Sequence, residues 1–156
     1  MISFRSLKAS DFPTMLEWLQ RPHVKEWWDD GDDTLKKVAD HYSSDPDTTF
    51  RYMVITGGGI PVGYIQYYME REDVVGIDLF IGEPDLLDQG LGTEIVAAFV
   101  ELVDSECGPR AIVIDPDPNN TRAIRCYEKA GFHFERIGTN AEGKGVYFMK
   151  LDRHVS

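Results

Sequence analysis

The most constraining feature of this sequence is a long helical pattern enclosed by two strand-like runs. The run VVGIDLFIG (74–82) reads as a strand, and TEIVAAFVELVDSE (93–106) carries apolar residues at helical spacing. The run RAIVID (110–115) reads as the next strand. A helix that joins two strands of one sheet makes a crossover, and crossovers connect parallel strands. The sequence therefore predicts a mixed α/β fold with some parallel pairing.

The rest of the chain divides into short elements of both kinds. The other expected strands are 2–7, 50–55, 62–69, 133–138 and 144–151, and the other expected helices start after Asp11, at 23, at 34 and after Asn120. Asp11 is expected to cap its helix, and Asp33 or Thr34 the third one. No linker, repeat or low-complexity segment interrupts this series. We therefore expect one domain over residues 1–156.

Composition narrows the possible partners. The net charge of −11 argues against nucleic acid as a partner, because a basic surface is needed to bind phosphates. An acidic protein attracts cations instead, although acidity also serves plain solubility. No apolar run approaches the ~20 residues of a membrane span. Two cysteines without CxxC spacing suggest a reducing compartment, so we expect a cytoplasmic protein.

Two glycines mark the junction between a loop and the long helix, in DQGLGTEIV. Backbone at Gly90 and Gly92 can approach an anion closely, and the first helical N–H groups have no partner inside the helix. A pyrophosphate would suit such a site. The segment is not a dinucleotide fingerprint, because the third glycine would fall at Ile95. Taken alone, the pair is also compatible with a simple structural turn.

A second motif follows about thirty residues later, after an intervening strand. It consists of an asparagine, a tyrosine and a Gly-Phe pair on one short helix, Asn120-x-x-Ala123-x-x-x-Tyr127-x-x-x-Gly131-Phe132. Together with the glycine loop it resembles the GNAT acetyltransferase superfamily. The resemblance implies a seven-stranded, mixed and mostly antiparallel sheet flanked by about four to five helices. It also implies acetyl-CoA as co-substrate and no metal.

The same resemblance assigns residues to the acetyl donor. In the superfamily the glycine loop holds the pyrophosphate of acetyl-CoA, and the later helix carries a tyrosine that protonates the departing thiolate. Here that tyrosine is Tyr127. The donor-binding residues implied are Phe80, Gln89, Gly90, Leu91, Gly92, Thr93 and Asn120. On residue type alone, a lone tyrosine on an apolar helix face is better explained as core, and only the surrounding motif reverses that.

Further segments resemble the aminoglycoside 6′-N-acetyltransferases, namely EWLQRPHVKEWW, PVGYIQYY, GIDLFIGEP and IDPDPNNTRAIRCYEKAGF. By this resemblance Asp78 lies near the reacting amine and Asp115 binds the substrate. The acceptor pocket would include Trp27, Trp28, Gln66 and Tyr68. A polyamine sugar is a polycation, which carboxylates and aromatic walls recognise well.

Several alternatives remain open at this point. The tryptophan pair could be core, the acidic run DDGDD a solvated loop, and Asp78 the partner of Arg122 or Arg125. The acceptor could instead be a siderophore precursor, a polyamine or a protein N-terminus. A non-catalytic acetyl-CoA sensor would keep the glycine loop but would need neither Tyr127 nor buried carboxylates. Either a monomer or a dimer is compatible with the sequence.

Overall fold

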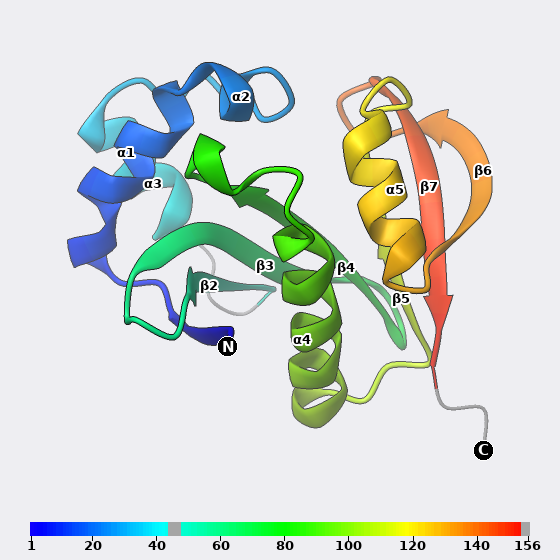
Figure 1. Cartoon of the computed structure of the whole chain (residues 1–156). Coiled ribbons are helices and arrows are strands. Elements are labelled where there is room, and N and C mark those ends of the chain that lie inside the picture. Colours follow the sequence, from blue (N-terminus) through cyan, green and yellow to red (C-terminus); the bar gives the residue numbers. More distant parts are fainter. Residues whose placement is uncertain (44–47, 154–156) are drawn as a thin grey trace. The chain divides into compact units, whose positions relative to one another are not determined.

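The protein is described by a computed structural model that covers residues 1–43 and 48–153. Within these residues seven strands form one sheet in the order β1-β2-β3-β4-β5-β7-β6 (Figure 1). The strands are β1 Ser3–Ser6, β2 Thr49–Ile55, β3 Pro61–Arg71, β4 Val74–Ile81, β5 Ala111–Ile114, β6 His133–Thr139 and β7 Gly145–Asp152. The helices are α1 Phe12–Gln20, α2 Pro22–Lys25, α3 Leu35–Tyr42, α4 Leu91–Glu106 and α5 Thr121–Lys129.

Strand pairing confirms the predicted mixed sheet. The pairs β1–β2, β5–β7 and β6–β7 are antiparallel, whereas β4 and β5 are parallel. The parallel pair is the one that α4 connects, as the crossover predicts. The β4–β5 ladder covers only three residue pairs and ends at Gly76 opposite Val113, although β4 continues to Ile81.

The chain forms two compact units, which share strands β3 and β4. Unit 1 comprises Met1–Gln66 and Leu79–Leu87, and unit 2 comprises Tyr67–Asp78 and Asp88–Ser156. Unit 1 is built around an apolar cluster that includes Met15, Trp18, Val38 and Tyr64. In unit 2 the predicted apolar stripe of α4 is buried, with Ile95, Val96, Phe99 and Val103 fully inaccessible. None of the described helices is long and apolar enough to cross a bilayer.

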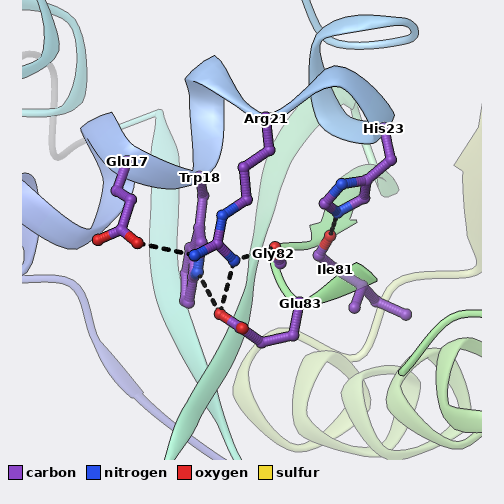
Figure 2. A network of polar contacts seen from close by, with 7 residues as sticks. All are labelled: Glu17, Trp18, Arg21, His23, Ile81, Gly82 and Glu83. Carbon is purple, nitrogen blue, oxygen red and sulfur yellow. Dashed lines mark hydrogen bonds and ion pairs between the residues drawn. The ribbon is translucent and has the colours of Figure 1, made fainter. Parts of the chain in front are cut away.

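A polar network in unit 1 fixes α1 and α2 to residues 81–83 (Figure 2). The Trp18 indole and the Arg21 guanidinium both donate to the Glu83 carboxylate, each at 2.9 Å. Arg21 also donates to the Gly82 carbonyl at 2.8 Å, and a ring nitrogen of His23 lies 2.9 Å from the Ile81 carbonyl oxygen. Four polar contacts from three side chains thus anchor the helices beside the end of β4.

Three local expectations need correction. The helix expected at 23–28 covers only Pro22–Lys25, because the chain leaves it in a turn and Trp28 packs on Tyr64 and Phe80. The carboxylate of Asp11 does not cap α1. It binds the Arg5 guanidinium at 2.7 Å, and an ion pair is the stronger partner.

The third correction concerns α4, which begins at Leu91, two residues before the expected start. Other caps are confirmed. Thr34 rather than Asp33 caps α3, accepting from the Lys37 amide at 3.2 Å. The Asn120 side chain accepts from the Ala123 amide at 3.3 Å and so caps α5.

Candidate active site

The glycine loop presents backbone N–H groups at the start of α4. Asp88 and Gly90 both have positive φ, +62° and +79°, which turns the chain sharply into the helix. The first α4 hydrogen bond runs from the Glu94 amide to the Gly90 carbonyl, and no side chain caps this end. The amides of residues 91–93 therefore have no acceptor inside the helix, which is the usual arrangement for binding an anion.

Helix α5 is tied to this loop by two contacts. The Arg122 guanidinium pairs with the Asp88 carboxylate at 2.9 Å, and the Thr93 hydroxyl donates to the Cys126 carbonyl at 3.3 Å. The first contact shows that Arg122 pairs with Asp88 of the loop. Both contacts hold the first turn of α4 against α5.

The end of α5 fixes Tyr127. Gly131 has φ +103°, and the Phe132 amide donates back to the Tyr127 carbonyl at 3.0 Å, as in a Schellman motif. The ring is buried and lies 6.4 Å from the Phe132 ring. Within residues 1–43 and 48–153 its hydroxyl makes no hydrogen bond. A buried phenol without a protein partner is suited to a ligand.

Two predicted carboxylates lie just beyond the paired part of β4 and β5 in unit 2. Gly76 of β4 lies opposite Val113 of β5, so their side-chain positions point the same way. Because side chains alternate along β4, Asp78 lies on the same face as Gly76, and Asp115 comes two residues after Val113. Asp115 directly follows β5, at the point where the β4–β5 ladder has already ended. What links the two predicted substrate carboxylates is that both raise the pKa of the Tyr68 and Tyr127 hydroxyls.

The electrostatics of this face are unusual for a protein surface. Burial, followed by the charges of Glu70 and Glu142, raises the pKa of Asp115 to about 6, only partly offset by a backbone N–H. Among the described residues no basic side chain forms an ion pair with Asp115. Its neighbour Asp117, in contrast, has Lys144 at 3.7 Å. Asp115 is thus a half-buried carboxylate whose neighbours are acidic.

Two tyrosines respond to the same carboxylates. Burial first, and then Asp78 and Asp115 among the nearby charges, raise the pKa of both Tyr68 and Tyr127 well above the ordinary value. Both phenols therefore stay protonated at neutral pH and can donate a hydrogen bond. Asp78, Asp115, Tyr68 and Tyr127 thus belong to one electrostatic group within unit 2.

Two predicted site residues of unit 1, Trp28 and Phe80, belong to an aromatic cluster. The Trp28 ring lies 5.1 Å from Phe80 and 6.0 Å from Tyr64, and its indole N–H donates to the Tyr42 hydroxyl at 3.1 Å. The Tyr64 hydroxyl donates to the Gln66 side chain at 2.5 Å. Trp27 is half-buried. Trp28 and Phe80 therefore contribute to the unit 1 core whatever else they contact.

The acidic run after Trp28 has internal partners. Asp33 pairs with Lys37, and Asp32 lies 2.7 Å from a ring nitrogen of His41. The ligand atoms of Asp30, Asp32 and His41 lie within 4.8 Å of one another, so these side chains could contact a cation. Exposed acidic groups commonly gather in this way without a metal.

The sequence profile of a family described as an acetyltransferase (GNAT) domain matches residues 8–139. The chain belongs to the GNAT acetyltransferases. It is therefore an acetyl-CoA-dependent N-acetyltransferase with the GNAT fold, which confirms the fold class and the enzyme class expected from the two motifs.

Three similar proteins indicate which acetyltransferases this GNAT acetyltransferase resembles. An aminoglycoside N(6′)-acetyltransferase type 1 from Klebsiella pneumoniae is 34% identical, over 96% of this chain and 82% of its own length. The structure of aminoglycoside acetyltransferase AAC(6′)-Ib with coenzyme A and kanamycin has a TM-score of 0.88 and 32% identity, covering 98% of this chain and 95% of that one. A lysine N-acyltransferase from Mycolicibacterium paratuberculosis is 24% identical over 85% of this chain and 65% of its own length.

The structure brings together only part of the predicted set. Gly90, Leu91, Gly92, Thr93 and Asn120 lie at the first turns of α4 and α5, and Gln89 is exposed just before α4. The sequence did not point to Glu70 or to the pairing of Arg122 with Asp88. Arg122 and Asp88 are 34 positions apart with no local pattern joining them. Glu70 shares a face of β3 with Tyr68 by strand alternation, and that was a signal that could have been used.

Proposed function

We propose that this acetyltransferase transfers the acetyl group of acetyl-CoA to a primary amine of a small polycation, most directly the 6′-amine of an aminoglycoside. The observation that carries the proposal is the carboxylate face of unit 2, where Asp115 has acidic neighbours and no ion pair within the described residues. Burying such a charge is unfavourable unless a cation joins it. Relatives that are named aminoglycoside acetyltransferases support this acceptor.

Acetyl-CoA would bind through its pyrophosphate to the backbone of residues 88–93. The exposed amides at the start of α4 supply hydrogen bonds, and the positive end of the helix dipole favours the anion. The remaining donor contacts would come from Asn120 and Phe80. In this proposal Asp88 and Arg122 hold the loop in shape, because their ion pair joins it to α5.

The chemistry would be direct attack in a ternary complex. The neutral amine nitrogen forms a bond to the thioester carbonyl carbon, and the carbon–sulfur bond then breaks. Asp78 accepts the proton that the amine loses, directly or through water, or anchors the amine electrostatically. The Tyr127 hydroxyl donates to the departing thiolate. Because its pKa lies well above the usual value for a thiol, Tyr127 stabilises the thiolate chiefly while remaining protonated.

The acceptor would be recognised by charge and by aromatic surface. Asp115 binds an ammonium group of the substrate, and Tyr68 borders the amine. Trp27, Trp28 and Gln66 contribute the acceptor contacts of unit 1, together with the acidic run 29–33. We further propose that residues 1–156 act as a single catalytic domain, that the protein works in the cytoplasm, and that acetylation of an aminoglycoside confers antibiotic resistance.

A second acceptor class has its own support. The lysine N-acyltransferase relative makes an amine or hydroxylamine derived from lysine a reasonable alternative, as in siderophore assembly. Such an acceptor carries fewer positive charges than an aminoglycoside. A singly charged acceptor would neutralise less of the carboxylate face of unit 2, so we favour a polycation.

The experiment is an amine panel read by release of the CoA thiol. Purified protein with acetyl-CoA is given kanamycin, tobramycin, spermidine or lysine, and initial rates are compared. We expect kcat/KM to be highest for the two aminoglycosides, with the acetyl group on the 6′-amine of kanamycin by mass spectrometry and NMR. A preference for lysine would support the siderophore alternative, and no thiol release with any amine would indicate a non-catalytic acetyl-CoA sensor.

A further inference from the structure

Gly76 lies inside strand β4, where glycine is normally avoided. A glycine in a strand interior weakens the strand, and it often marks a place where another group approaches the backbone closely. Gly76 is not among the glycines with positive φ, so its backbone conformation does not require glycine. The reason for a glycine must therefore be space above the strand.

That space is filled by the ring of Tyr68. A Cβ atom placed on Gly76 would lie 2.3 Å from Cζ and 2.5 Å from the hydroxyl oxygen of Tyr68. Separations below 3.0 Å are not tolerated, so any side chain at position 76 would push the ring away. Gly82 makes similar room for Trp18, but the Trp18 indole already donates to Glu83.

The contact with Gly76 keeps the Tyr68 hydroxyl over β4, the strand that carries Asp78. Gly76 and Asp78 project from the same face of β4, and the charges of Asp78 and Asp115 both act on the Tyr68 hydroxyl. Within residues 1–43 and 48–153 the Tyr68 hydroxyl makes no hydrogen bond, and its raised pKa keeps it protonated. A protonated phenol can donate to a carboxylate and accept from an ammonium N–H at the same time.

We propose that Gly76 is a specificity-determining positioning residue, which seats the Tyr68 ring on β4 so that its hydroxyl orients the acceptor amine beside Asp78. This inference rests on the proposed acetyl transfer to an amine. Gly76 itself touches no substrate and acts through Tyr68. Its effect is therefore expected on the acceptor side of the reaction and not on the binding of acetyl-CoA.

A double-mutant cycle tests the inference. The variants are Gly76→Ala, Tyr68→Ala and the two together, with Gly145→Ala as the control, because a Cβ on that β7 glycine meets nothing within 4 Å. Gly76→Ala should raise the acceptor KM about tenfold, since displacing a positioning group by about 1 Å is costly. The donor KM should stay within about twofold of wild type in every variant. In the Tyr68→Ala background, Gly76→Ala should add nothing.

Each outcome is decisive. An unchanged acceptor KM in folded Gly76→Ala overturns the inference, and so does an effect that persists undiminished without the Tyr68 ring. If Gly76→Ala does not fold, Tyr68→Leu removes the ring without crowding the strand, and it must raise the acceptor KM alone. Wild-type protein that acetylates no amine overturns the proposed function. Wild-type turnover with an unaffected Gly76→Ala overturns only this role of Gly76.

Discussion

Glu83 and Asp115 are two half-buried carboxylates placed in opposite electrostatic surroundings. Glu83 in unit 1 accepts hydrogen bonds from Trp18 and Arg21, and these contacts lower its pKa (Figure 2). Asp115 in unit 2 is surrounded by Glu70 and Glu142, and burial raises its pKa to about 6. The first carboxylate is paired within the protein, whereas the second has no ion pair among the described residues.

This difference separates structural charge from functional charge. A half-buried carboxylate with donors stabilises the fold, and removing its charge leaves the donors without a partner. A half-buried carboxylate with acidic neighbours destabilises the fold, and it persists where a ligand supplies the missing cation. On this view the network around Glu83 holds α1 and α2 in place, and the face containing Asp78 and Asp115 binds the amine.

Within the contrast between the Glu83 network and the carboxylate face, we expect the largest effect from Asp78→Asn. This change removes the charge and basicity of the Asp78 side chain but keeps its shape. We expect kcat/KM to fall at least about 100-fold at neutral pH, with loss of the acidic limb of the pH–rate profile. Asp152→Asn, at the exposed end of β7, is the matched control. Near-normal turnover in folded Asp78→Asn would leave Asp78 as a structural residue. A surviving acidic limb would transfer the role of base to Asp115.

Tyr127→Phe tests whether the electrostatic group extends to α5. Removing the hydroxyl should lower kcat about 100-fold, because the leaving thiolate loses its hydrogen-bond donor. The apparent affinity for acetyl-CoA should remain near that of wild type, as the ring still packs on Phe132. Full kcat in this variant would mean that water is the acid and that Tyr127 is a core residue.

Gly92→Val tests the role of the donor loop, residues 88–93, independently of the carboxylate face. A branched side chain at the start of α4 should block close approach of the pyrophosphate and raise the KM for acetyl-CoA about tenfold or more. The acceptor KM should change little. An unchanged donor KM, measured with thermal unfolding as a check on folding, would remove residues 88–93 from the donor site.

The salt dependence of the acceptor KM is the smallest expected effect, and it tests whether the acceptor is recognised by its charge. Exposed charges are screened over ~8 Å at physiological ionic strength, so the acceptor KM should rise a few-fold between about 50 and 500 mM salt. The donor KM is measured alongside. An acceptor KM that ignores salt, or a preference for neutral amines, would contradict recognition of a polycation.

The fold was largely predictable because its signals are local. The apolar stripe of α4, the Asn120 cap and the Gly131 stop each depend on a few neighbouring residues, and the structure confirms all three. The end of α2 and the role of Asp11 were not predictable. In both places a distant partner prevails over the local pattern, as when Trp28 packs on Phe80 or Arg5 binds Asp11.

The candidate site was predictable in its residue types but not in its electrostatics. The glycine pair is visible at the start of the α4 pattern, Tyr127 was singled out by the resemblance to the GNAT superfamily, and alternation places Asp78 apart from its apolar neighbours. The pKa of Asp115 is raised first by burial and then by the charge of Glu70, which is 45 positions earlier in the chain. The packing of the Tyr68 ring on Gly76 likewise depends on how β3 and β4 lie beside each other in the sheet. Neither could be read from a single stretch of sequence.

The central claim is that Asp115 is a destabilising carboxylate kept for a ligand, and one pair of variants tests it directly. Because the folded-state pKa of Asp115 is raised from 3.8 to about 6, the native state loses stability as pH rises through this range. One pKa unit corresponds to about 1.4 kcal/mol, and partial exposure reduces the effect, so Asp115→Asn should stabilise the free protein by about 1–2 kcal/mol at pH 7.5. The gain should vanish near pH 4.

Glu83→Gln is the opposite case in the same measurement. The pKa of Glu83 is lowered, so its stabilisation is present above the unfolded-state value of 4.5 and is lost as pH falls through the folded-state value. We expect Glu83→Gln to lower Tm at pH 7.5 with little change in acceptor KM. Asp115→Asn should raise Tm and also raise acceptor KM about tenfold. A lower Tm for Asp115→Asn at pH 7.5, with acceptor KM unchanged, would contradict the account.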